Sequence, residues 1–83
     1  MGIDTERMKY KGRLAAKREE AKSLHLRIEG DMHAIRNILD PFMPLHEVRA
    51  DIAAAQAVEL AAKHAEYVGL LEEIKAIEKA LGD

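Results

Sequence analysis

The chain of 83 residues carries 13 Lys and Arg against 15 Asp and Glu, a formal net charge of -2 at pH 7, and 48% of its residues are hydrophobic. This length allows one domain with a small core, and the slightly acidic balance argues against a general nucleic-acid binder. Because the chain has no Cys, disulfides and thiolate metal sites are excluded, and a reducing compartment is the natural setting.

The opening segment, residues 1–6, lacks the apolar run of a secretory signal, and Glu6 stands where N-myristoylation needs Ser or Thr. No apolar run reaches the roughly 20 residues that cross a membrane. We therefore expect a cytoplasmic protein without a membrane partner.

The first predicted element is one long helix over about residues 4–39, with Asp4 or Thr5 as its N-cap. Apolar residues recur at steps of three, four or seven, which is the pattern of a single helical stripe. In heptads, Lys17 and Asp31 interrupt one of the two core positions.

A turn is predicted over residues 40–44, because this segment contains Pro41 and Pro44. Each Pro lacks an N–H and pushes the residue before it toward extended geometry. The second helix is predicted over about residues 45–81, with Gly82 as its stop. Its apolar phase slips by one residue between Ile52 and Leu60, within an Ala-rich stretch.

These elements predict an all-α fold in which residues 1–83 form a single antiparallel, coiled-coil-like two-helix hairpin. A turn centred near residue 42 would place Leu24 opposite Leu60. It would also place Gly30 and Gly69 opposite small residues, where the two backbones could approach closely. Alternatively, each Gly only weakens its own helix. The predicted hairpin core consists of Tyr10, Leu14, Leu24, Ile28, Ile35, Ile38, Leu45, Ile52, Leu60, Tyr67, Leu70, Ile74 and Leu81.

Two helices cannot enclose a core, because each covers only one side of the other. Further apolar residues widen the stripe beyond a two-stranded seam, namely Leu26, Met32, Leu39, Val58, Val68, Leu71 and Ile77. We therefore expect a homo-oligomer, either a dimer of hairpins forming a four-helix bundle or a tetramer, together with a protein partner of unknown identity.

No catalytic, cofactor or metal site is predicted. Nucleophilic triads are excluded by the absence of Cys and by a single Ser and a single Thr, and the five Gly residues form no phosphate loop. His25 and His33, with Glu29 between them, lack the spacing and the third ligand of a metal site. We expect a protein that is not an enzyme.

Charge is distributed unevenly along the chain. Residues 1–27 hold eight Lys and Arg against four acids, whereas residues 28–83 hold five against eleven. The basic stretch of the first helix could contact nucleic acid or could pair with glutamates of the second helix, and we favour the pairing. The residues of this stretch are Arg7, Lys9, Lys11, Arg13, Lys17 and Arg18.

Several short strings of the sequence resemble small helical proteins of Mu-like transposable phages and prophages. The strings are residues 9–14 (KYKGRL), 39–42 (LDPF), 57–61 (AVELA), 66–71 (EYVGLL) and 80–82 (ALG). The resemblance implies a bacterial host cytoplasm and a phage accessory role, and it carries over no catalytic residue. The leading hypothesis is a structural or protein-interaction protein, and the alternative is a nucleic-acid-binding accessory protein.

Overall fold

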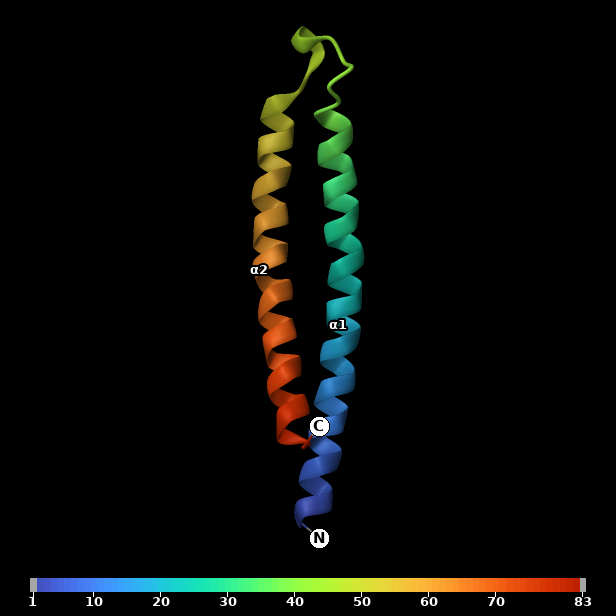
Figure 1. Cartoon of the computed structure of the whole chain (residues 1–83), viewed down its shortest axis with the longest axis vertical. Helices are drawn as coiled ribbons and strands as arrows, with labels where there is room; N and C mark the ends of the chain where they lie inside the picture. The colour runs from blue at the N-terminus through green and yellow to red at the C-terminus, as the bar shows by residue number, and fades with distance from the viewer. Residues whose placement is uncertain (1, 83) are drawn as a thin grey trace.

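The computed structural model describes residues 2–82, with side chains from residue 4 onward. Two long α-helices, α1 (Gly2–Ile38) and α2 (Ala50–Ala80), are joined by a connection that contains one 3-10 turn, η1 (Leu45–Glu47). The helices lie side by side and run in opposite directions (Figure 1). Within residues 2–82 there is no β-strand. The predicted all-α hairpin is confirmed.

The hairpin is a thin rod. Its extents are 67 × 16 × 15 Å, and its radius of gyration is 18.9 Å. At the open end of the hairpin α1 extends beyond α2, and the connection closes the other end, which we call the tip (Figure 1).

The end of α1 is set by Asp40 and Pro41. Pro41 disfavours helical geometry at Asp40, and the Asp40 carboxylate Oδ1 accepts a hydrogen bond from the Phe42 backbone N–H at 2.9 Å. This side-chain turn replaces the next helical hydrogen bond, so the chain leaves the helix axis. Arg36 in the last turn complements the negative end of the helix dipole.

The second helix begins later than the predicted residue 45. Residues Leu45–Glu47 form only the η1 turn, Val48 is extended with ψ of 126°, and α2 begins at Ala50. Leu45 is 91% exposed and lies outside the core, contrary to the prediction. A β-branched residue such as Val48 favours extended backbone, which explains why the first turn does not continue into α2.

The longer connection shifts the register of the two helices by about two turns from the prediction. A turn centred near residue 42 would place Tyr67 opposite Lys17, whereas the Tyr67 ring lies 5.9 Å from that of His25. The expected close approach at Gly30 and Gly69 is absent, because a Cβ built on either residue would have no neighbouring atom within 4 Å.

Heptads continue along α2 without the predicted slip. Ala53 is 4% exposed and occupies the core position, whereas its neighbour Ile52 is 37% exposed. Gln56 and Lys63 occupy other positions of the same repeat. The buried residues are Leu14, Ala21, Leu24, Ala53, Leu70, Ile74 and Leu81.

The remaining predicted core residues are less covered. Ile28 and Tyr67 pack against the buried cluster, together with Ile77. Three more predicted residues are half-buried, namely Ile35, Ile38 and Leu60. Tyr10 is 36% exposed and lies near the open end. The core of one hairpin is therefore a narrow seam rather than an enclosed interior.

Candidate functional site

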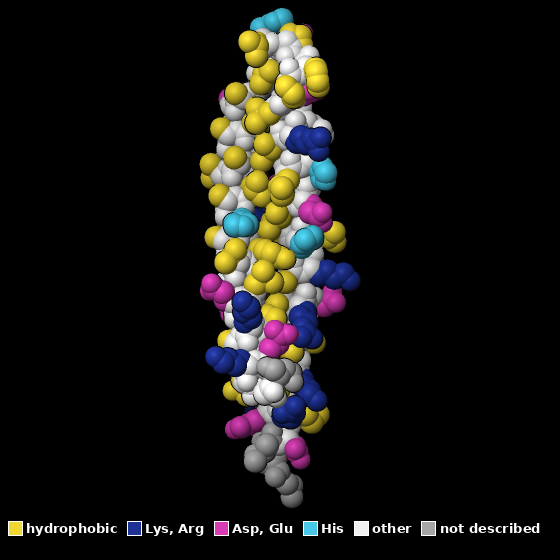
Figure 2. All heavy atoms as spheres, in the orientation of Figure 1, with side chains coloured by type: hydrophobic (Ala, Val, Ile, Leu, Met, Phe, Trp, Pro, Cys, Tyr) yellow, Lys and Arg dark blue, Asp and Glu magenta, His cyan; other side chains and the backbone are white. Residues whose placement is uncertain are grey.

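An open apolar groove runs along the seam between the helices toward the tip. It has a volume of about 420 Å³ and is lined by Ile28, Met32, Ala57, Leu60, Ala61 and His64. Figure 2 shows the side of the molecule on which hydrophobic side chains follow the seam over the upper part of the rod, with His side chains beside them. Four of its six lining residues, Ile28, Leu60, Ala57 and Ala61, are aliphatic, so the groove is mainly apolar.

The rows of side chains that flank the groove continue along the rod, because residues seven apart lie on nearly the same side of a helix. The hydrogen bond from Arg18 Nη2 to Glu78 Oε2, at 2.8 Å, shows that the corresponding rows of the two helices meet. We name these rows the groove face, which consists of Lys11, Arg18, His25, Met32 and Leu39 of α1 with Ala57, Ala61, His64, Val68, Leu71, Lys75 and Glu78 of α2.

The groove face changes in chemistry along its length. From the tip as far as Leu71 its large apolar side chains are open to solvent, with Met32 55%, Leu39 48%, Val68 40% and Leu71 42% exposed. Toward the open end it becomes basic, and Figure 2 shows Lys and Arg side chains gathered there on both helices. One face therefore combines an apolar half with a cationic half.

The opposite flank of the seam is charged along most of its length. We name it the charged face, which consists of Arg13, Glu20 and Arg27 of α1 with Glu59, Glu66 and Glu73 of α2. All of these residues are exposed. The two faces that flank the seam therefore differ in polarity, and the groove face carries more of the apolar side chains.

Two polar pairs cross the seam between the helices. Lys63 Nζ donates a hydrogen bond to Asp31 Oδ2 at 2.7 Å, and Lys17 Nζ lies 2.6 Å from Glu73 Oε2. The hydrogen bond to Glu73, together with its charge, raises the pKa of Lys17 above its usual 10.5. Lys17 and Asp31, the two polar residues that interrupt the α1 heptads, thus each pair with an oppositely charged side chain of α2.

The basic stretch of α1 is divided by its contacts with α2. Arg18 pairs with Glu78, Lys17 pairs with Glu73, and Arg7 Nη1 donates to the Leu81 carbonyl oxygen at 3.2 Å. The Arg13 guanidinium lies over the Tyr10 ring, 5.9 Å from its centroid.

Among the described residues, only Lys17 and Arg18 of this stretch form ion pairs. Lys9 and Lys11 point to different sides of the helix because they are two positions apart. The stretch is therefore not a single basic face.

His25 contacts an acidic side chain of its own helix and a tyrosine of α2. His25 Nε2 lies 3.0 Å from Glu29 Oε1, and its Nδ1 lies 3.5 Å from the Tyr67 hydroxyl. Within the described part of the chain, no group of three or more His, Cys, Asp or Glu side chains is placed to hold a metal ion. His25 and His64 instead flank the apolar seam.

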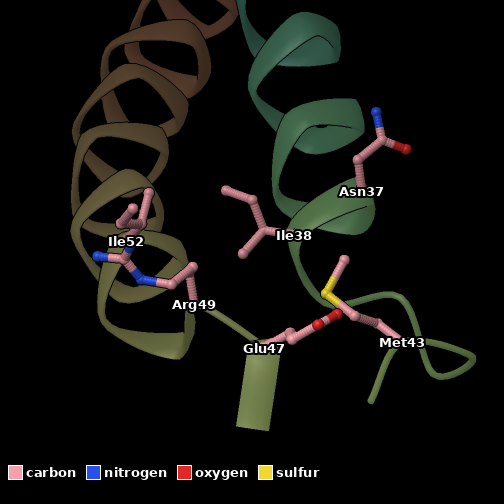
Figure 3. A pocket seen from close by; sticks show the side chains of 6 residues that line it. All are labelled: Asn37, Ile38, Met43, Glu47, Arg49 and Ile52. Atoms are coloured by element: carbon pink, nitrogen blue, oxygen red, sulfur yellow. The ribbon is translucent and has the colours of Figure 1, made fainter. Parts of the chain in front are cut away.

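A smaller hollow lies at the tip, where the connection folds back beside both helices. It has a volume of about 290 Å³ and is lined by Asn37, Ile38, Met43, Glu47, Arg49 and Ile52. In Figure 3, Ile38 points from α1 toward α2, with Ile52 on the opposite wall.

Beside this hollow, Arg49 Nη2 donates to Asp51 Oδ2 at 3.3 Å. This pairing, aided by the Ile52 backbone N–H, lowers the pKa of Asp51 from its usual 3.8. The first turn of α2 is thereby held to the residue that precedes it.

Sequence reasoning found most apolar residues of the groove face but could not separate them from Leu26 and Val58, which lie on the outer surfaces of the helices. Ala57, Ala61 and His64 were missed because small or polar residues give no hydrophobic signal. The signal of Ala57 and His64 is positional, since Ala57, His64 and Leu71 follow one another at intervals of seven residues.

Comparisons of the chain with models of protein families, with curated proteins and with solved structures find no match. In the part of the chain that the structure describes, neither helix combines the length and apolar character needed to cross a bilayer.

Proposed function

We propose that this chain is a structural protein that acts through protein–protein interaction, and that two hairpins associate into a four-helix bundle. The observation that carries the proposal is the incomplete core. Among the described residues, no large side chain is less than 2% exposed, while Met32, Leu39 and Leu71 stand open beside the seam. Chains of this size gain stability by association when one core is too small.

Association would leave the outer surfaces of the helices and the charged face available to a further protein. That surface displays both signs of charge in long rows, which favours recognition by complementary charges. The resemblance to helical proteins of Mu-like phages makes a phage or host protein the partner that we propose.

The test is the absolute mass by light scattering behind size exclusion, over a hundredfold range of concentration, with helicity followed by circular dichroism. We expect a mass of two chains or more, and a loss of helicity as the assembly dissociates on dilution. A helical monomer at every concentration contradicts the proposal.

Nucleic-acid binding is a second candidate, and one observation favours it. Lys75 of α2 belongs to the same basic half of the groove face as Lys11 and Arg18. Its support is weaker because Arg18 is already paired with Glu78. The candidate predicts DNA or RNA binding that weakens steeply with salt, with a smaller slope in Lys11→Ala and Lys75→Ala. Absence of binding at low salt removes it.

A further inference from the structure

We propose that the groove face is the surface on which a second copy of this chain packs, in antiparallel orientation about a twofold axis that crosses the groove near Ala61. This inference rests on the proposed self-association and adds two properties to it, namely the face that is used and the orientation of the copies.

The choice of face follows from the distribution of exposed apolar side chains. Met32, Leu39, Val68 and Leu71 all lie on the groove face and are between 40% and 55% exposed. The charged face instead carries a row of glutamates that would lose hydration if it were buried against a copy of itself. Of the two faces that flank the seam, burial of apolar surface therefore favours the groove face. Leu26 and Val58 are also exposed, but they lie singly on the outer surfaces of the helices.

The shape of the groove fits a helical partner. Ala57 and Ala61 form a low region in the wall of the groove, with the larger Met32 beside them. Small residues allow a neighbouring helix to come close, and the larger ones fill the space between ridges.

The available area fits a dimer. A face of 67 by 16 Å offers about 1,000 Å² in projection, and a standard interface covers about 800 Å² on each partner. A second hairpin thus needs most of the length of the groove face, which requires an axis near the middle of the rod. Ala61 lies in the middle third of α2.

Charge determines the orientation. Toward the open end, the groove face carries Lys11, Arg18 and Lys75 with one acid, Glu78. A parallel arrangement would stack these cations on the same cations of the second copy, and like charges in apposition are unfavourable. The antiparallel arrangement separates them and places each basic half beside the apolar half of the second copy, away from the cations of that copy.

The test uses spin labels on single Cys variants and pulsed distance measurement. Because the chain has no Cys, each variant carries one label per copy. The variants are Ala61→Cys in the groove, Lys75→Cys at the basic end of the same face, and Ala62→Cys as a matched control. Ala61 and Ala62 are adjacent and exposed, but Ala62 points away from the groove.

We expect a short distance between Ala61 labels, below about 20 Å, and a long one of about 40 Å between Lys75 labels, because Lys75 lies about 20 Å farther along α2. The Ala62 labels should be farther apart than the Ala61 labels. A labelled Ala61 variant that becomes monomeric, while labelled Ala62 remains dimeric, also supports the face.

Other results overturn the inference in distinguishable ways. Short distances at both Ala61 and Lys75 mean a parallel dimer. A short distance at Ala62 with a long one at Ala61 means that another face is used, while the proposed self-association stands. If unlabelled protein is a monomer by mass, both the inference and the proposed function fail.

Discussion

Asp31 and Lys63 meet across the seam at positions where the heptads of both helices would otherwise carry apolar residues, and Lys63 Nζ donates to Asp31 Oδ2 at 2.7 Å. Their side chains are only 26% and 29% exposed. A polar pair of this kind stabilises one register, because a shift of either helix would leave a half-buried charge opposite an apolar side chain.

A double-mutant cycle with Asp31→Ala and Lys63→Ala should therefore give a coupling of about 1 kcal/mol in urea unfolding at fixed protein concentration. The control is the same cycle on Arg18 and Glu78, a pair across the same seam whose side chains are 57% and 37% exposed. Its coupling should be smaller. Equal couplings for the two pairs would show that burial does not distinguish them.

Gln56 should lower the free energy of unfolding, and replacing it should stabilise the protein. Its Oε1 is buried and accepts no hydrogen bond from the described residues, and an unsatisfied buried polar atom costs roughly 1–3 kcal/mol. Gln56→Met keeps a similar shape without this atom and should raise the free energy of unfolding by about 1 kcal/mol. A decrease in denaturant titrations would mean that Gln56 has a partner in solution.

Gly30→Ala and Gly69→Ala should each stabilise the protein by about 0.5–1 kcal/mol, because Ala is the better helix former and neither site has an atom within 4 Å of the added Cβ. Gly82→Ala is the contrasting variant. Its φ of +83° suits only glycine, so this change should cost up to about 1 kcal/mol. Thermal unfolding measures all three. Destabilisation by Gly30→Ala would indicate another chain packed closely at that site.

Leu70→Ala should lower the free energy of unfolding by about 2–4 kcal/mol, because Leu70 is 6% exposed and packs in the buried cluster. Leu26→Ala provides the matched control. Leu26 is 63% exposed on the outer surface of α1, and its replacement should change stability by less than about 0.5 kcal/mol. A large loss from Leu26→Ala would show that the outer surface of α1 is covered in solution.

Asp51→Asn should destabilise the start of α2 at neutral pH but not in acid. The pKa of Asp51 is lowered in the folded protein, first by its hydrogen bond with Arg49. Its carboxylate therefore stabilises the fold above the usual pKa of 3.8, and this contribution disappears as the pH falls through the lowered value. The melting temperatures of the two proteins should differ at pH 7 and converge below pH 3.8. A constant difference would contradict the assignment.

The long first helix was predictable because its signal is local and repeated. Steps of three, four or seven residues continue from Tyr10 to Ile38, and no Pro interrupts them. The stop was equally clear, since Asp40 and Pro41 combine a turn-forming side chain with a backbone restriction. These signals are local, so they do not depend on which residues of the second helix lie opposite the first.

The register of the two helices was not predictable, because it depends on the number of residues in the connection between them. Pro44 suggested an immediate helix start, but Val48 turned out to be extended and α2 begins at Ala50. The core position at Ala53 was also missed, since the larger Ile52 beside it gave the stronger hydrophobic signal. The exposed Ile52 and the buried Ala53 differ by one residue, and only heptad counting back from Leu60 separates them.

The groove face could be anticipated only in part. Its apolar members were recognised as extra width of the stripe, but assigning them to one side required the true pairing of the helices. The contact between Arg18 and Glu78 provides that pairing. The basic residues predicted to act together lie on different sides of the hairpin. The side that each one faces depends on its angle around α1, which the linear sequence order does not show.

The rod shape affects the mass that size-exclusion chromatography assigns to this protein. A compact chain of 83 residues would have a radius of gyration of about 12 Å, and the observed 18.9 Å is the value for a compact protein of about 290 residues. A single hairpin would thus elute from a sizing column earlier than a compact protein of the same mass and could be mistaken for an oligomer. Elution volume alone is therefore uninformative for this chain, and a globular calibration curve would assign it subunits that it does not have.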